Sequence, residues 1–147
     1  MSLSSKLPSN INLVYWDYYH TMADSYIRKI KEHRDLGFEP WVAGGIWTWN
    51  RLVTALPFTF ESSRACLSAC KSSGIKNVFV TVWGDDGNEF DVMSALPGFQ
   101  YYSEQCYAPG DDVLWDRFRY NFAGVCGGKL EDWVCPTNRF DITDVCE

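Results

Sequence analysis

The chain has 147 residues, a formal net charge of −6 at pH 7 and an aromatic content of 16 %. It contains no basic run, so a surface that follows nucleic-acid phosphates is not expected, and no apolar stretch approaches the roughly 18 residues of a membrane span. The length suits one modest domain and falls well short of the roughly 250 residues of a complete (β/α)₈ barrel.

The N-terminal segment 1–10 is polar and rich in serine, and we interpret it as a leader or linker. It lacks the apolar segment of a secretory signal, which indicates a cytoplasmic protein. A first strand is expected over 11–16. Apolar residues then recur at helical spacing from Met22 to His33, and Gly37 ends this helix.

A second strand is expected over 39–47, where Gly44 and Gly45 let the backbone pass close to a neighbour. A loop is expected over 50–57. A second helix follows, with small apolar residues at helical spacing, and Gly74 ends it.

A third strand is expected over 77–83, where almost no polar residue interrupts the apolar run. A strand that is apolar on both faces is buried on both faces, as in a parallel sheet, and we expect the same here. A third helical region covers 89–106 and is broken near Pro97.

The last third of the chain predicts a further helix, capped by Asp111 or Asp112 and ended by Gly124, and then an irregular, partly helical tail. The predicted organisation is three β/α units over 11–108 and a helical C-terminal extension over 109–147.

Strands that alternate with helices predict an α/β fold with a parallel sheet. Three strands alone would leave two unpaired edges, so the chain is either a small layered sheet with a further strand or part of a larger barrel. The barrel is favoured because each strand ends in aromatic and polar residues, and barrels bind ligands at these ends. Unpaired apolar edges also recruit partners, so we expect the isolated chain to form a homo-oligomer.

The three strand ends combine tryptophan or tyrosine rings with carboxylates. Tryptophan covers the apolar face of a pyranose, and carboxylates accept hydrogen bonds from its hydroxyl groups, so this combination is typical of a sugar-binding site. The candidate sugar-binding residues are Tyr15, Asp17, Tyr18, Trp47, Trp49, Trp83, Asp85 and Glu89.

Alternation along the first strand places Tyr15 and Asp17 on one face and Trp16 and Tyr18 on the other. A tyrosine hydroxyl and a carboxylate that converge on one cavity can hold an amide carbonyl and a sugar hydroxyl. A packed aromatic strand end is the structural alternative.

The other two strand ends follow the same rule. Trp47 and Trp49 share a face and either wall an apolar pocket or pack in the core, while Trp83 and Asp85 share a face beside a turn. A solvated acidic turn is the alternative there, since the alternating spacing of a calcium loop is not met.

The six cysteines do not have the spacing of a zinc site, and we expect neither a metal nor a cofactor. Free thiols are the favoured interpretation. A disulfide that joins Cys126 to Cys135 or Cys146 is the alternative for an exported protein.

Four short motifs at the strand ends carry a resemblance to a known family: Tyr15-x-Asp17, Trp83-x-Asp85, VAGGIWTW at 42–49 and TVWGDDG at 81–87. In their order and spacing they resemble the C-terminal half of the family 20 glycoside hydrolases, the β-N-acetylhexosaminidases. The resemblance covers roughly residues 11–108. It implies a partial (β/α)₈ barrel in which the three strands are the sixth, seventh and eighth.

The resemblance implies a retaining mechanism in which the 2-acetamido group of the substrate is the nucleophile. An adjacent Asp-Glu pair on the fourth strand supplies the acid in this family, and the present sequence contains no such pair. We therefore expect the chain to be inactive alone, to bind an N-acetylhexosamine-containing glycan in the −1 subsite, and to need the missing N-terminal half of the barrel.

Two roles stay open within the resemblance. The family often has Glu where Asp85 stands, so the partner of the 4- and 6-hydroxyl groups is Asp85, Asp86 or Glu89. The tyrosine that holds the acetamido carbonyl is Tyr15 or Tyr18.

Two functions of other classes remain as alternatives. The first is a standalone carbohydrate-binding or interaction module. The second is a two-carboxylate glycosidase that uses Asp17 and Asp85, whose separation would then decide the stereochemistry.

Overall fold

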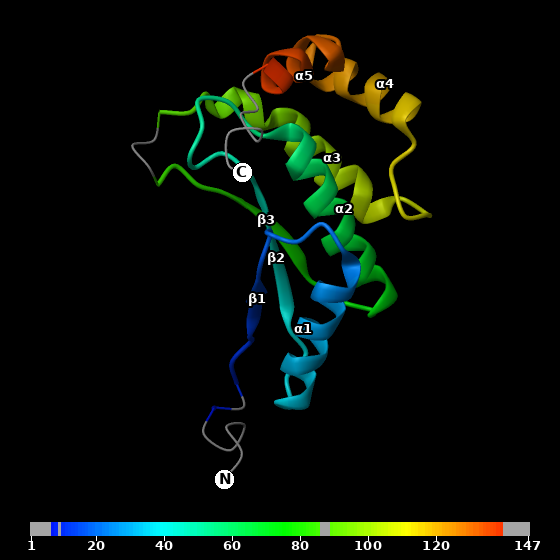
Figure 1. The fold of residues 1–147 in the computed structure, drawn as a ribbon. Helices are drawn as coiled ribbons and strands as arrows, with labels where there is room; N and C mark the ends of the chain where they lie inside the picture. The colour runs from blue at the N-terminus through cyan, green and yellow to red at the C-terminus, as the bar shows by residue number, and fades with distance from the viewer. Residues whose placement is uncertain (1–6, 9, 86–88, 140–147) are drawn as a thin grey trace.

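The computed structural model describes residues 7–8, 10–85 and 89–139, with side chains as far as residue 134. Over this part of the chain the fold is α/β, with a small parallel sheet and helices that follow each strand (Figure 1). The elements are β1 (Val14–Trp16), α1 (Ala23–Asp35), β2 (Trp41–Ile46), α2 (Leu56–Ser72), β3 (Val78–Val82), the 3₁₀ helix η2 (Val92–Ala95), α3 (Leu96–Tyr107), α4 (Trp115–Cys126) and α5 (Leu130–Arg139).

The three strands pair in the order β1-β2-β3, all parallel, as the alternation of strands and helices predicts. Val14 lies opposite Trp41 in the first pair, and Val42 lies opposite Val78 in the second. Sequential parallel strands require a helical crossover between them, and α1 and α2 are these crossovers.

Helices α1, α2 and α3 cover one face of the sheet (Figure 1). We call this the helix face, and we call the opposite face the open face because no helix of the described residues covers it. Six side chains lie on the open face along the strands: Val14, Trp16, Trp41, Ala43, Phe79 and Thr81.

The prediction that the third strand is buried on both faces is wrong. Phe79 is 40 % exposed on the open face, and the remaining residues of β3 are half-buried. The reason is that β3 pairs only with β2 among the described residues and has helices on only one side. Over the described residues an apolar strand therefore stands at an edge of the sheet, where unpaired backbone groups can pair with a further strand.

The core under the helix face joins β1 and β2 to α1 and α2. Its buried members are Tyr15, Tyr26, Ile30, Val42, Ala65, Cys66, Ala69 and Cys70. Small residues on α2 let the helix approach the sheet closely, while Tyr26 and Ile30 of α1 fill the remaining space. Burying each large side chain of this kind contributes about 1.5–3 kcal/mol.

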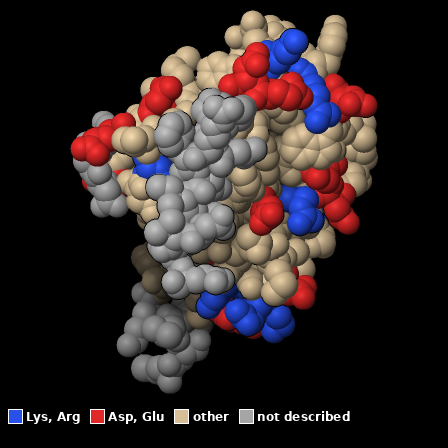
Figure 2. All heavy atoms as spheres, turned by 45° about the horizontal axis from the view of Figure 1, so that its top comes forward, with Lys and Arg blue, Asp and Glu red and all other residues tan. Residues whose placement is uncertain are grey.

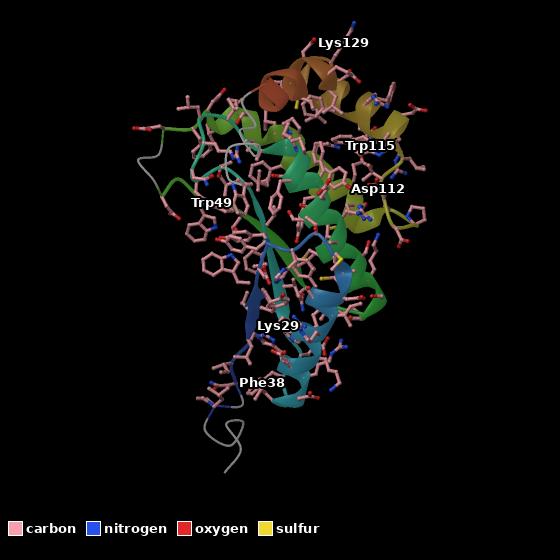
Figure 3. All side chains as sticks on the ribbon, in the orientation of Figure 1. Lys29, Phe38, Trp49, Asp112, Trp115 and Lys129 are labelled. Carbon is pink, nitrogen blue, oxygen red and sulfur yellow. The ribbon has the colours of Figure 1, made fainter. Side chains whose placement is uncertain are left out.

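A second core attaches the C-terminal helices to α3. Its buried members are Tyr101, Val113, Phe118, Phe122 and Leu130. Asp112 accepts hydrogen bonds from the Tyr101 hydroxyl at 2.6 Å and from Trp115 Nε1 at 3.3 Å, so it ties the start of the extension to α3 (Figure 3).

Several element boundaries differ from those predicted. Helix α2 begins inside the predicted loop, because Pro57 suits the first turn of a helix. Helix α4 begins at Trp115 and not at the aspartates, because Asp112 is used to hold Tyr101. It ends at Cys126, where Gly127 takes a left-handed conformation with φ of 72° and closes the helix.

The four cysteines with described side chains, Cys66, Cys70, Cys106 and Cys126, are free thiols. A hydrogen bond with the neighbouring Cys70 thiol, followed by burial, raises the pKa of the Cys66 thiol. Cys66 therefore stays protonated and unreactive. The side chains of Cys135 and Cys146 lie outside the described residues.

Candidate functional site

Six aromatic side chains gather at the carboxyl ends of the three strands. We call them the aromatic cluster: Trp16, Tyr18, Tyr19, Trp47, Trp49 and Trp83. Each strand end contributes at least one ring, so segments far apart in the sequence meet here because the sheet is parallel. In Figure 3, Trp49 lies beside these strand ends, away from Asp112 and Trp115 on the helix side.

Ring contacts run through the whole cluster. Trp16 stacks on Trp83 with ring centroids 5.0 Å apart and an interplanar angle of 30°. Trp49 lies 4.9 Å from Tyr18 and 4.2 Å from Trp47. Contacts at these distances are attractive beyond simple burial, by about 0.5–1.5 kcal/mol per pair. The cluster therefore forms a continuous apolar wall.

The backbone of β2 makes room for the cluster. The Tyr18 ring lies directly over Gly45, and a Cβ added at Gly45 would lie 2.6 Å from this ring. On the helix face, a Cβ at Gly44 would lie 2.8 Å from the ring of Tyr102. The expectation that this glycine pair lets a neighbour approach is confirmed, and the neighbours are two tyrosine rings on opposite faces.

Hydrogen bonds fix two of the tryptophans. Trp83 Nε1 donates to Thr81 Oγ1 at 2.9 Å, and Thr81 Oγ1 donates to the Gly44 carbonyl at the same distance. Trp47 Nε1 donates to Asn50 Oδ1 at 3.0 Å. Both indole N–H groups are thus satisfied within the protein, which leaves the ring faces as the surfaces available to a ligand.

Tyr15 and Asp17 lie on the other side of the sheet from the cluster, with Tyr15 buried in the core against α1. The Tyr15 hydroxyl donates to Asp17 Oδ2 at 2.7 Å, and the Tyr19 backbone N–H donates to Asp17 Oδ1 at 3.0 Å. His20 Nε2 lies 3.3 Å from the same carboxylate. Burial, followed by the hydrogen bond to Asp17, raises the pKa of Tyr15 far above its ordinary range.

Tyr18 is a buried member of the cluster with a distinctive electrostatic setting. Burial first, and then the neighbouring Tyr19, Asp85 and Asp17, raise its pKa to about 12. The hydroxyl is therefore neutral at physiological pH and able to donate a hydrogen bond.

A cavity of about 390 Å³ adjoins the cluster through Trp49. Its lining residues are Thr48, Trp49, Asn50, Arg51, Leu52, Glu89 and Phe90. Glu89 thus reaches the site from the segment after β3, while Asp85 is exposed at the end of that strand. Asp86, the third carboxylate considered for the sugar hydroxyl groups, lies outside the described residues.

Three residues of the aromatic cluster and its support were not among the candidates: Trp16, Tyr19 and Thr81. The cavity adds Thr48, Asn50, Arg51, Leu52 and Phe90, which were not candidates either. The signal for Trp16 was present, because strand alternation already placed it with Tyr18. Thr81 had no such signal. Its role depends on the position of Trp83, which only the pairing of β2 with β3 determines.

On the face of the molecule in Figure 2, acidic and basic side chains are interspersed among the described residues. Within the part of the chain that the structure describes, no group of three His, Cys, Asp or Glu residues is arranged to hold a metal ion. Nor is any helix there both long and apolar enough to cross a membrane.

The site therefore combines flat apolar rings, a neutral tyrosine hydroxyl and exposed carboxylates, and it contains no described group of metal ligands. Such an arrangement can bind a polar ring with an apolar face. In comparisons with known proteins, no protein-family model matches the chain and no curated protein is significantly similar to it.

Proposed function

We propose that this chain is the C-terminal part of a (β/α)₈ barrel from a β-N-acetylhexosaminidase-like glycosidase, and that it supplies the sugar-binding surface. The observation that carries the proposal is the aromatic cluster at the carboxyl ends of three parallel strands. In barrels of this class, ligands bind at that end. The motifs at the strand ends, which resemble those of family 20 glycoside hydrolases, supply the substrate class.

The roles follow from the chemistry of each side chain. The rings of Trp47 and Trp49 form an apolar wall suited to an acetamido methyl group, and the neutral Tyr18 hydroxyl can donate to the acetamido carbonyl. Asp85 and Glu89 can accept hydrogen bonds from sugar hydroxyl groups. Tyr15 has no direct role in this proposal, because it is buried on the helix face and its hydroxyl holds Asp17.

The acid that protonates the leaving group is not part of the proposed contribution. Family 20 enzymes need an adjacent Asp-Glu pair, and the sequence has none. Losing a positioned general acid costs about 10²–10⁴-fold in rate. We therefore propose that this chain binds the glycan and that a separate barrel half, paired with the free sheet edges, supplies the acid.

Binding is tested by calorimetry with a thiazoline analogue of N-acetylglucosamine, which mimics the cyclised intermediate of the substrate-assisted mechanism. We expect the chain to bind the analogue and Asp85→Asn to weaken binding about ten- to a hundredfold, since a charge-assisted hydrogen bond is worth about 1.5–3 kcal/mol. The matched control is Asp35→Asn at the far end of α1, where an exposed carboxylate pairs only with Lys31. This control should leave affinity unchanged.

Activity provides the second arm of the test. The isolated chain should not turn over an aryl N-acetyl-β-glucosaminide. Turnover at an ordinary glycosidase rate would contradict the proposal and favour the two-carboxylate alternative with Asp17 and Asp85. A chain that binds the analogue while it sediments as a compact monomer at every concentration would instead favour a standalone carbohydrate-binding module.

A further inference from the structure

Hydrogen bonds join the segment that follows β2 to the segment that follows β3, beyond the carboxyl ends of the two strands. The Asp91 backbone N–H donates to the Leu52 carbonyl at 2.8 Å. The Thr54 backbone N–H donates to Ser94 Oγ at 2.9 Å, and the hydroxyl groups of the same two residues lie 2.9 Å apart. Thr54 and Ser94 are both buried. We call these three bonds the loop clip.

The number of protons fixes the direction of each bond at Ser94. A hydroxyl group has one proton to donate and two lone pairs that accept. Ser94 Oγ donates its proton to the Asp91 carbonyl at 2.6 Å. The Thr54 hydroxyl is therefore the donor to Ser94 Oγ, which accepts from both the N–H and the O–H of Thr54. Removing this one oxygen takes away the partner of both Thr54 groups, whereas the Asp91 carbonyl still accepts from the Ser94 N–H.

The two clipped segments line the cavity of about 390 Å³ from opposite sides. Residues 48–52 come from the segment after β2, and Glu89 and Phe90 come from the segment after β3. Where the strands end, the buried Thr48 hydroxyl donates to the Trp83 carbonyl at 2.7 Å. The segments are thus joined at the strand ends and again at the loop clip. A cavity between walls that are held in this way is formed before a ligand binds, and less ordering entropy is lost on binding.

The loop clip also anchors the chain two residues after Glu89. Glu89 is exposed and lines the cavity. The Asp91 backbone is bonded to Leu52, and Asp91 Oδ1 accepts from the Met93 N–H at 2.9 Å at the start of η2. Asp91 is therefore held on both sides, and this sets the direction of the chain that carries Glu89. A carboxylate that is placed in advance contributes more to affinity than one that must be ordered by the ligand.

We propose that Ser94 is a positioning residue of the sugar site: through the loop clip it holds Glu89 at the cavity beside Trp49, where the carboxylate accepts hydrogen bonds from sugar hydroxyl groups. The inference rests on the proposed function, because Ser94 acts through a residue of the same site. Ser94 itself does not contact the sugar, since it is buried and its proton and lone pairs are all used within the protein.

Two positions of the clip are changed, and calorimetry measures the affinity of the whole chain for the thiazoline analogue. Ser94→Ala removes the oxygen on which the clip depends. Affinity should fall about three- to tenfold, because it is reduced by the fraction of molecules in which the clip is formed. Thr54→Val removes only the bond from the hydroxyl and keeps the N–H, so its loss should be smaller. Thr54→Ser keeps the hydroxyl and should bind like the wild-type chain.

A double-mutant cycle with Glu89→Gln separates positioning from a general loss of structure. If the clip acts through Glu89, losing the clip can weaken binding no more than losing the carboxylate does. Glu89→Gln should weaken binding about tenfold, and adding Ser94→Ala to it should cause no further loss. A merely structural role of Ser94 would lower the thermal midpoint and leave the affinity of the folded chain unchanged.

Ser62→Ala in α2 is the matched control. Ser62 is also buried, and its hydroxyl donates to the Thr59 carbonyl of the same helix at 3.3 Å. Losing a buried hydroxyl should lower the thermal midpoint in both Ser62→Ala and Ser94→Ala. Only Ser94→Ala should lower the affinity.

Amide hydrogen exchange tests the loop clip without any ligand. The Asp91 and Thr54 amides should be protected in the wild-type chain, and both should lose most of this protection in Ser94→Ala, while the amides of β2 keep theirs. If the two amides exchange in the wild-type chain as fast as those of an open loop, the inference is overturned whatever the ligand does.

The outcomes separate the two proposals. If the wild-type chain binds and Ser94→Ala binds equally well, the inference is overturned while the sugar site stands. The same holds if the double variant binds more weakly than Glu89→Gln, because the clip then acts on something other than Glu89. If the wild-type chain does not bind the analogue, both proposals are overturned together.

Discussion

Five tyrosines combine deep burial with strong electrostatic perturbation. Burial is the first cause in each, and it raises the pKa of Tyr15, Tyr18, Tyr26, Tyr101 and Tyr102. Tyr15 illustrates the reason: its hydroxyl is enclosed in the core and already donates to a carboxylate, so ionisation would place two negative charges together. These groups therefore stay protonated in the folded chain well beyond their ordinary pKa of 10.0.

This has a consequence for stability at alkaline pH. In the unfolded chain the tyrosines ionise near pH 10, whereas in the folded chain Tyr18 ionises only near 12 and Tyr15 higher still. The stabilising contribution is therefore complete below pH 10 and is lost as the pH rises through the folded pKa. We expect the thermal midpoint to fall between pH 10 and 12, together with a rise in tyrosinate absorbance.

The variant Tyr15→Phe tests whether this fall comes from the buried hydroxyl groups. It should cost about 1 kcal/mol at neutral pH through the lost hydrogen bond to Asp17, and its midpoint should fall less steeply above pH 10. Two results would show that Tyr15 is not buried as described: a wild-type thermal midpoint that does not change up to pH 12, or a midpoint that falls with pH as steeply in Tyr15→Phe as in the wild-type chain.

At the scale of elements, β2 is the strand on which the site depends. It is the central strand, it is almost fully buried, and its glycine pair receives a tyrosine ring on each face. Tyr102 of α3 lies over Gly44 and donates to the Phe79 carbonyl at 3.0 Å, which fixes α3 to the sheet. The same strand therefore sets the helix layer on one side and the aromatic cluster on the other.

Gly45→Ala tests this arrangement. Its Cβ would lie 2.6 Å from the Tyr18 ring, so the ring must move, and we expect a loss of about 1–3 kcal/mol in stability. Sugar affinity should fall as well, because Tyr18 contacts both Trp16 and Trp49. The measurements are denaturant unfolding and calorimetry on the same protein.

A second glycine provides the control. Gly124 lies within α4, where an added Cβ meets nothing within 4 Å, so Gly124→Ala should raise stability by roughly 0.5–1 kcal/mol through helix propensity. Affinity should not change. A Gly45→Ala variant as stable as Gly124→Ala would mean that Tyr18 does not lie over the central strand.

At the scale of the whole molecule, the sheet has two free edges and an apolar open face. The Val42 N–H donates to the Asn77 carbonyl. In a parallel strand, the backbone groups of successive residues point alternately to the two neighbouring sides. The N–H and C=O groups of Val78, Val80 and Val82 therefore point away from β2, to the free edge of β3. Beside this edge runs a groove of about 810 Å³, between β3 and α3. A further parallel strand followed by a helix would fill both.

We therefore expect the isolated chain to self-associate. The edges of β1 and β3 run in the same direction, so β1 of each copy can pair in parallel with β3 of the other. If both edges pair in this way, the two sheets close around their open faces. Sedimentation velocity over a concentration series should show a dimer or larger species. Phe79→Lys, which places a charge on the open face, should shift the chain to monomer.

The control for self-association is Tyr120→Lys, which changes an aromatic residue that is 80 % exposed on α4. This variant should sediment like the wild-type chain. A compact wild-type monomer at every concentration would contradict the prediction. If Phe79→Lys and Tyr120→Lys both shift the chain to monomer, the cause is general charge repulsion and not a specific sheet contact.

The order of the elements and the parallel sheet could be predicted from the sequence. The evidence was local: apolar runs of strand length, helical spacing between them, and the helix-ending glycines Gly37 and Gly74, which take positive φ. Gly124, the predicted end of the next helix, lies inside α4, and Gly127 ends that helix. The sequence also determined which strand ends carry aromatic rings, because strand direction and alternation depend only on neighbouring residues. Helix starts were less predictable, since Asp112 resembles a cap yet is used by Tyr101 and Trp115.

Which of the candidate residues meet depends on the tertiary structure. The motif resemblance placed Tyr15 and Asp17 in the sugar site, but the helix layer packs over their face, which buries Tyr15 in the core and leaves Trp16 on the open face. The stack of Trp16 on Trp83 joins residues of β1 and β3 across the central strand, and the register of two strand pairs sets it. Contacts of this kind depend on relative strand position, which no local pattern encodes.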